Sequence, residues 1–127
     1  MFPDELVSVA GRLVEYCNNN QEAEALDTLY AEDCVSVEAL AMGEAGREAE
    51  GLGAIRGKHD WWFGAHEVHK ASAEGPFLFG DDQFSVIFDM DVTNRESGQR
   101  TQMKEVAVYT VKGGKIVREE FHYPPMG

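Results

Sequence analysis

Two glutamates near the end of the chain, Glu105 and Glu119, stand in segments otherwise dominated by apolar and aromatic residues. A carboxyl group on an apolar strand face loses hydration, and its pKa rises unless a partner compensates. A raised pKa lets a carboxyl group accept or donate a proton near neutral pH. The sequence therefore predicts acid–base chemistry at these two residues, with a salt bridge or an exposed rim position as the alternative for each.

The direction of both side chains depends on a hairpin predicted from two strands, 103–111 and 116–123, around Lys112-Gly113-Gly114. A two-residue Gly113-Gly114 turn would pair Glu105 with His122. A three-residue loop with Gly114 in the left-handed conformation shifts the pairing by one residue. We favour this second register because it gathers the aromatic residues on one face. That face would hold Met103, Glu105, Ala107, Tyr109, Val111, Val117, Glu119, Phe121 and Tyr123.

Histidines on a helix expected over 52–66 are further candidates. Ile55, His59, Trp62 and His66 follow one another at spacings of four, three and four residues, which places them on one stripe of that helix. One interpretation of the stripe is structural: Trp62 packs on a sheet. The other is functional: His66, or His69 just beyond the helix, reaches a pocket mouth and acts as an acid or base. His66 and His69 lack the spacing of the zinc-protease helix motif, so we predict no metal site and no cofactor.

These residues must be positioned by helices that come early in the chain and strands that come late. Apolar residues recur every three or four positions over 6–17 and again within 21–30, whereas 42–53 is glycine-rich, acidic and typical of a loop. A short β-prone segment lies at 34–37, and alternation over 84–93 begins a series of antiparallel strands. The pattern predicts one α+β domain spanning 1–127.

Composition and charge narrow the function. The chain has 127 residues, 43% of them hydrophobic, and a formal net charge of −12, with 12 acidic and 2 basic residues in 1–50. Binding to nucleic acid or to anionic lipid depends on basic residues, so we expect neither as a partner. No apolar run is long enough for a membrane span, and Cys17 and Cys34 have no metal-like spacing. We expect a cytoplasmic protein whose two cysteines are thiols.

The organisation resembles the nuclear transport factor 2-like superfamily, and within it the SnoaL-like polyketide cyclase group. The resemblance rests on two N-terminal helices, the segment LYAEDCVSVE at 29–38, Gly53-x-Ile55-Arg56-Gly57 in the third helix, and Gly114-Lys115-Ile116-Val117 in the last hairpin. It implies a cone-shaped, cystatin-like roll, in which a curved, mainly antiparallel sheet with a mixed edge wraps around three helices. It also implies an internal pocket and a homodimer built through the sheet.

The functional residues of the family carry over only in part. Steroid isomerases of this fold have a stretch similar to 29–38 that closes on a catalytic Asp, and an ungapped match places Glu38 there. Alternation predicts that Val35 and Val37 face inward, so only a bulge would turn Glu38 inward. Other positions where the family carries its tyrosine, histidine and aspartate are here Val14, Ala107 and Phe121.

The acids and the resemblance together predict a small-molecule pocket protein. One interpretation is a cofactor-independent isomerase, cyclase or hydratase that acts by proton transfer on a hydrophobic carbonyl compound. In it Glu105 is the base, His69 or Glu38 a second proton-transfer group, and Tyr109 a donor to developing negative charge. The substrate would also meet Trp62, His66, Glu119, Phe121 and Tyr123. The alternatives are a non-catalytic ligand-binding domain and a dimeric structural domain, the latter favoured by a cavity below about 300 Å³.

Overall fold

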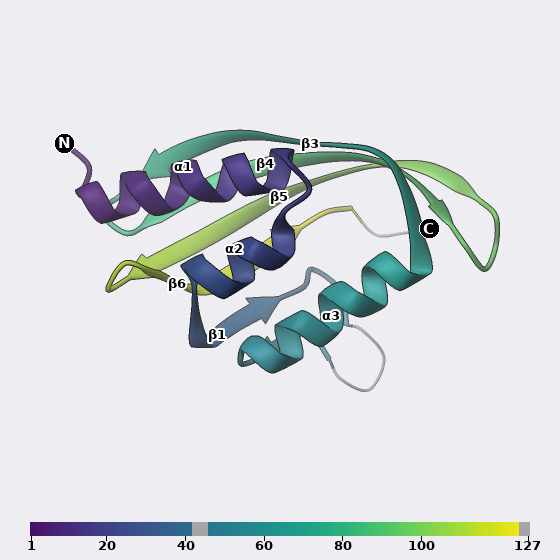
Figure 1. Cartoon of the computed structure of the whole chain (residues 1–127), viewed down its shortest axis with the longest axis horizontal. Coiled ribbons are helices and arrows are strands. Elements are labelled where there is room, and N and C mark those ends of the chain that lie inside the picture. The colour runs from purple at the N-terminus through teal and green to yellow at the C-terminus, as the bar shows by residue number, and fades with distance from the viewer. Residues whose placement is uncertain (42–45, 125–127) are drawn as a thin grey trace.

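The computed structural model describes residues 1–41 and 46–124, in which three helices pack on one face of a curved sheet (Figure 1). The helices are α1 (Asp4–Asn18), α2 (Glu22–Leu29) and α3 (Leu52–Ala65). The apolar stripe expected for the first helix is buried, at Leu6, Val9, Ala10 and Leu13. This burial against the sheet stabilises α1 more than intrinsic helix propensity does.

The described strands form a six-stranded sheet in the order β2-β1-β6-β5-β4-β3. Only the β1–β6 pair is parallel, and all other neighbours are antiparallel. The long strands curve around the helices (Figure 1), which confirms the expected α+β cone. The strands are β1 (Tyr30–Val37), β2 (Glu48–Glu50), β3 (His66–Phe79), β4 (Gln83–Asn94), β5 (Arg100–Lys112) and β6 (Lys115–His122).

The last hairpin places Glu105, Tyr109, Glu119 and Phe121 on one face as expected, but its strand pairing is not the expected one. Tyr109 pairs with Glu119 and Ala107 with Phe121, whereas a loop at 112–114 would have set Tyr109 opposite Val117 and Ala107 opposite Glu119. The loop itself has two residues: Gly113 and Gly114 have φ of 60° and 75°, the left-handed values that a tight hairpin turn needs. The one-residue shift comes instead from a bulge after Thr110/Arg118, which leaves one residue of β6 unpaired. The prediction of a three-residue loop was therefore wrong.

Because of the same bulge, the inward face differs from the predicted one at one residue of β6. Val111 pairs with Ile116, and Ile116 is fully buried in the core, whereas Val117 is only half-buried. A bulge adds one residue and so reverses the alternation on one side of it. Ile116, not Val117, therefore completes the inward face near the turn.

Two early segments also differ from expectation. In β1 Tyr30, Cys34, Ser36 and Val37 are all buried, but Cys34 and Ser36, both at 0% exposure, are the ones on the side of Glu38 and the cavity, because the β1–β6 register shifts between Tyr30 and Val35. Val35 and Val37 are therefore not the inward pair. The stretch 42–53 is not one loop, since β2 forms there and α3 begins at Leu52; residues 42–45 lie outside the described ranges.

Cys17 and Cys34 are free thiols, as predicted. In the part of the chain that the structure describes, every helix is too short or too polar to cross a lipid bilayer.

The end of α1 is fixed to edge strand β3 by one amide side chain. Asn18 Nδ2 donates to the Ala73 carbonyl oxygen at 3.0 Å, and the Ala73 amide donates back to Asn18 Oδ1 at 2.9 Å. The side chain thus satisfies both backbone groups of Ala73, as a neighbouring strand would.

We expect Asn18→Asp to lower the free energy of unfolding by about 1 kcal/mol, because a carboxylate cannot donate to the Ala73 carbonyl. Asn20→Asp is the matched control, since it adds the same charge close to the same helix end, at an exposed position whose side chain makes no hydrogen bond with the described residues. Urea unfolding monitored by circular dichroism measures both variants. Equal stability losses would contradict a specific role for the Asn18 pair.

The outer face of the sheet carries exposed apolar residues, and the expected homodimer would use it. Phe77, Phe79 and Val106 are 46%, 40% and 39% exposed. We predict a light-scattering mass of twice the 14.1 kDa chain. Val106→Lys should reduce the mass to that of one chain, whereas Val7→Lys, an exposed apolar position on α1, should not. A monomeric wild-type protein would contradict this prediction.

Candidate functional site

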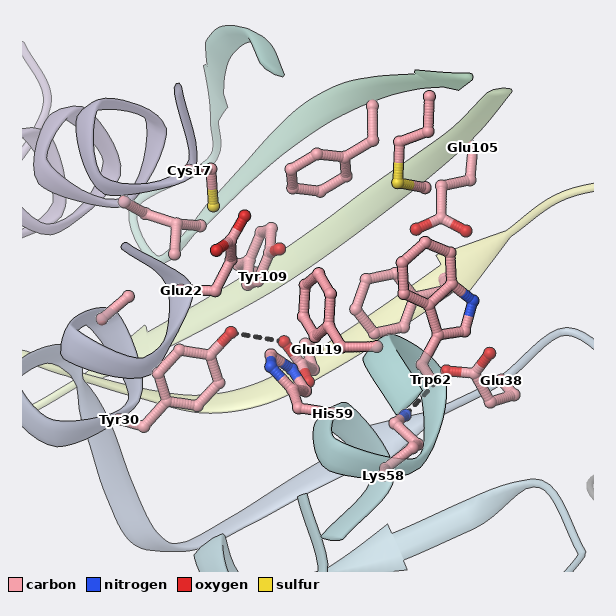
Figure 2. Close-up of a pocket in the computed structure, with 16 residues that line it drawn as sticks. Cys17, Glu22, Tyr30, Glu38, Lys58, His59, Trp62, Glu105, Tyr109 and Glu119 are labelled. Carbon is pink, nitrogen blue, oxygen red and sulfur yellow. Dashed lines mark hydrogen bonds and ion pairs between the residues drawn. The ribbon is translucent and has the colours of Figure 1, made fainter. Parts of the chain in front are cut away.

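A cavity of about 170 Å³ lies between the concave face of the sheet and the helices (Figure 2). Apolar side chains from every layer form most of its wall, and several ionisable groups interrupt them. The apolar side chains include Leu13, Trp62, Phe63, Phe88, Met90 and Phe121. The ionisable ones are Cys17, Glu22, Tyr30, Glu38, Lys58, His59, Glu105, Tyr109 and Glu119.

Three glutamates approach this cavity from three positions in the sheet. Glu105 comes from β5, Glu119 from its neighbour β6, and Glu38 directly follows β1 (Figure 2). Glu38 faces inward because it continues the alternation of Cys34 and Ser36. Among the described lining residues, Lys58 of α3 carries the only permanent positive charge. With Glu22 of α2, the described lining therefore holds four acids and one lysine.

Lys58 joins Glu38 to the interior. Its Nζ lies 2.7 Å from Glu38 Oε2 and 2.6 Å from Ser36 Oγ, and 5.1 Å from the centre of the Phe121 ring. Tyr123 donates its hydroxyl hydrogen to Glu38 Oε1 at 2.9 Å. Both oxygens of Glu38 are therefore engaged, and its charge is balanced in a position where both partners are largely buried.

Glu119 is completely buried and opposite Tyr109 on the neighbouring strand. The Tyr30 hydroxyl donates to its Oε2 at 2.5 Å, while Oε1 has no hydrogen-bond partner within the described residues. Burial raises the pKa of Glu119, and the Tyr30 hydrogen bond, the nearby Ser36 hydroxyl and the charge of Lys58 oppose the rise. Burial favours the protonated form of Glu119, and in that form Oε1, the oxygen without a partner, carries the proton.

Glu105 accepts no hydrogen bond from any described residue, although its side chain is partly buried in the cavity wall. Burial, reinforced by the negative charge of Glu38, raises the pKa of Glu105 to about 7, and the positive charge of Lys58 opposes the rise. A carboxyl group with this pKa is present in both protonation states at neutral pH.

Cys17 and Tyr109 differ from Glu105 in this respect. Burial raises the pKa of the Cys17 thiol to about 12 and the pKa of Tyr109 well above its usual value. The thiol therefore does not ionise near neutral pH, and Tyr109 keeps the hydroxyl hydrogen that it could donate.

The structure separates the two predicted histidines from the cavity. His69 is exposed at a bulge in β3, where the pairing with β4 shifts between Val68 and Lys70, and its Nε2 lies 2.7 Å from Thr93 Oγ1. The expectation that His69 reaches the pocket is therefore wrong. His66 stacks on Trp62 at 4.6 Å and lines a neighbouring groove instead. Trp62 itself lines the cavity.

Sequence reasoning missed Lys58 and Tyr30. Lys58 lies three residues after Ile55 and four before Trp62, so its spacing places it on the stripe already identified. Tyr30 was assigned to the end of the second helix but begins β1. Neither residue type draws attention by itself, because lysines usually lie in solvent and tyrosines often pack.

Burial of Glu105 gives a testable dependence of stability on pH. Its folded-state pKa of about 7 exceeds the ordinary value near 4.5. The folded chain therefore binds the Glu105 proton more tightly than the unfolded chain does. The stability gained from this proton is complete below pH 4.5 and is lost as the pH rises through 7. Glu105→Gln cannot titrate. The free energy of unfolding of Glu105→Gln, relative to that of wild type, should therefore increase by about 2 kcal/mol between pH 5 and pH 8.

Urea unfolding at both pH values measures this difference, and Glu67→Gln, at an exposed position of β3, is the control. A Glu105→Gln advantage that does not change with pH would show that Glu105 titrates like a solvated carboxyl group.

Comparisons with known proteins agree with this architecture. A model of the SnoaL-like domain matches residues 6–123. A protein from Mesorhizobium loti, provisionally described as a SnoaL-like polyketide cyclase [carbohydrate phosphatase], is 40% identical, with a TM-score of 0.86 over 92% of this chain and 97% of that one.

Two further solved structures share the fold at low identity. The Δ5-3-ketosteroid isomerase from Mycobacterium sp. is 17% identical, with a TM-score of 0.67 over 94% of this chain and 93% of that one. TerC, crystallised with polyporic acid, is 15% identical, with a TM-score of 0.72 over 95% and 92%. No protein with curated annotation matches the chain. The family match over nearly the whole described chain shows that this protein belongs to the SnoaL-like domain family.

Proposed function

We propose that this protein is an enzyme that moves a proton at the carbon next to a carbonyl group, with Glu105 as the base. The observation that carries the proposal is the state of Glu105: a carboxyl group on the cavity wall, with no hydrogen-bond partner among the described residues and a pKa of about 7. Such a group gains and loses a proton at neutral pH at little cost.

The reaction needs one proton transfer in each direction. Glu105 takes the proton as the C–H bond breaks, and the electron pair of that bond forms a C=C bond. The π electrons of the carbonyl move to its oxygen, which becomes an enolate. Return of the proton from Glu105 to a conjugated carbon gives isomerisation. If the proton on Glu105 first exchanges with solvent, delivery of the solvent proton or deuteron to the original carbon gives exchange, and in both cases Glu105 regains its initial state.

Glu119 and Tyr109 are placed to stabilise the enolate oxygen. Burial raises the pKa of Glu119 and so favours the acid form, whose proton the unpartnered Oε1 could donate, and the buried Tyr109 lines the same cavity. Hydrogen-bond donors fixed in a water-poor site stabilise developing negative charge strongly. The Lys58–Glu38 pair holds a second carboxylate beside Glu105 and helps to keep its pKa near 7.

The cavity volume limits what part of a substrate it holds. At about 170 Å³ it is smaller than the roughly 300 Å³ at which ligand pockets usually begin. An apolar cavity of about 150 Å³ holds one benzene ring. A single six-membered ring with a carbonyl group therefore matches this cavity, and a complete steroid or polyketide does not.

The same volume favours the second candidate, a structural domain without turnover. The burial of Glu119 argues against a purely structural domain. Burying a carboxyl group with one unpartnered oxygen costs free energy, and packing alone does not require it. The relatives support catalysis only through their descriptions, one as an isomerase of ketosteroids and one as a polyketide cyclase. An assay for proton exchange separates the two candidates.

Cyclohexanone in D₂O is a suitable test compound, because loss of its C2 and C6 protons is visible by NMR. We expect the protein to accelerate this exchange above the buffer rate. The rate should rise with pH and reach half its maximum near pH 7, since only ionised Glu105 accepts the proton. Glu105→Gln should slow the catalysed exchange at least about 100-fold.

Glu67→Gln provides a matched charge change outside the cavity and should exchange at the wild-type rate. A Glu105→Gln protein as active as wild type would remove Glu105 from the mechanism. Exchange at the buffer rate with wild-type protein would instead support the structural domain.

A further inference from the structure

A second hollow, a groove of about 670 Å³, lies beside the cavity and is bounded by α2, α3, β3 and β4. Four side chains line both spaces: Glu22, His59, Phe63 and Met90. The cavity and the groove therefore meet at these four residues. Together the two spaces fall within the range of about 300–1,000 Å³ that is usual for ligand sites, which the cavity alone does not reach.

We infer that the groove binds an alkyl side chain of the same molecule whose carbonyl-bearing ring occupies the cavity, so that the substrate class is a ring ketone with an alkyl substituent. This inference rests on the proposed function for the identity of the ring. It adds a second subsite, and it places the opening of the cavity between Glu22, His59, Phe63 and Met90.

The groove offers a chain an apolar path. Beyond the four shared residues, its apolar lining comes from both sides: Ala23 and Leu26 from α2, and Val68 and Ala71 from β3. Phe63 is 41% exposed and stands at the junction, where a ligand chain would cover it. Burial of such surface by each methylene group of a chain favours binding.

The charges at the junction favour an uncharged chain over an ionic one. Burial raises the pKa of Glu22 and lowers the pKa of His59, and both shifts favour the neutral form of the side chain. Three more charged side chains line the groove: Arg56 forms an ion pair with Asp27, outside the lining, whereas Asp60 and Arg95 are exposed at its edge, where water can hydrate their charges. A charged substituent would also have to pass these weakly hydrated groups, at a desolvation cost.

Two ketones that differ only in the chain test the inference: cyclohexanone and 4-pentylcyclohexanone. We expect the pentyl compound to bind wild-type protein at least about tenfold more tightly, as measured by ligand-observed NMR titration. Ala71→Trp fills the groove from β3 and should abolish this gain, while the affinity for cyclohexanone changes less than about twofold.

Two further variants keep the result interpretable. Ala23→Trp fills the groove from an exposed position of α2, so it repeats the test if Ala71→Trp does not fold. Ser72→Trp places the same side chain at an exposed position next to Ala71, outside the groove lining, and should keep the full gain from the chain.

Equal affinities of wild-type protein for the two ketones would overturn the inference. Groove variants that lower the affinity for both ketones to the same extent would also overturn it. Proton exchange separates this result from the proposed function. A chain-dependent affinity without exchange would leave the groove assignment standing and remove the catalytic role, whereas exchange without chain dependence would do the reverse.

Discussion

The ion pair between Lys58 and Glu38 decides the chemistry of the cavity. Lys58 is the only lysine or arginine in the described lining, and it pairs with one of the three acids that the sheet side contributes. Lys58 lies 2.7 Å from Glu38, and Tyr123 holds the other oxygen of that carboxylate. Glu119 is left with a tyrosine and an unpartnered oxygen, and Glu105 with no described partner. Burial therefore dominates the pKa of both, and the fixed charge of Glu38 raises the pKa of Glu105 further.

The sheet makes this arrangement possible through its irregularities. The bulge in β6 shifts the pairing by one residue beyond the two-residue turn and so sets Tyr109 opposite Glu119. The register shift in the β1–β6 pair turns Ser36 and Glu38 inward, where Lys58 meets both. Bulges often re-aim side chains next to functional sites, and here each one brings a carboxyl group to the cavity wall.

Strand alternation was enough to predict that Glu105 and Glu119 share the inward face of the last hairpin, because period two places alternate residues on one face. It did not predict that Ile116 takes the place of Val117 beyond the bulge. It failed where a strand is irregular. Glu38 follows a register shift, and a shift of one residue exchanges the two faces. His69 was expected from the helix stripe that precedes it, and it lies instead at a bulge of β3. Lys58 could have been found from its helix spacing, but its burial depends on Glu38 and Ser36, which are distant in sequence. The fold itself, with long periodic segments, was predicted more fully than the site.

The account depends on a proton held by Glu105 at neutral pH. The most direct test is an NMR titration of the carboxyl carbon of Glu105 in protein labelled with ¹³C at glutamate, assigned by comparison with Glu105→Gln. The account predicts a midpoint near pH 7. A midpoint near the ordinary glutamate value of 4.5 would contradict it, because the carboxyl group would then be hydrated and ionised throughout the neutral range.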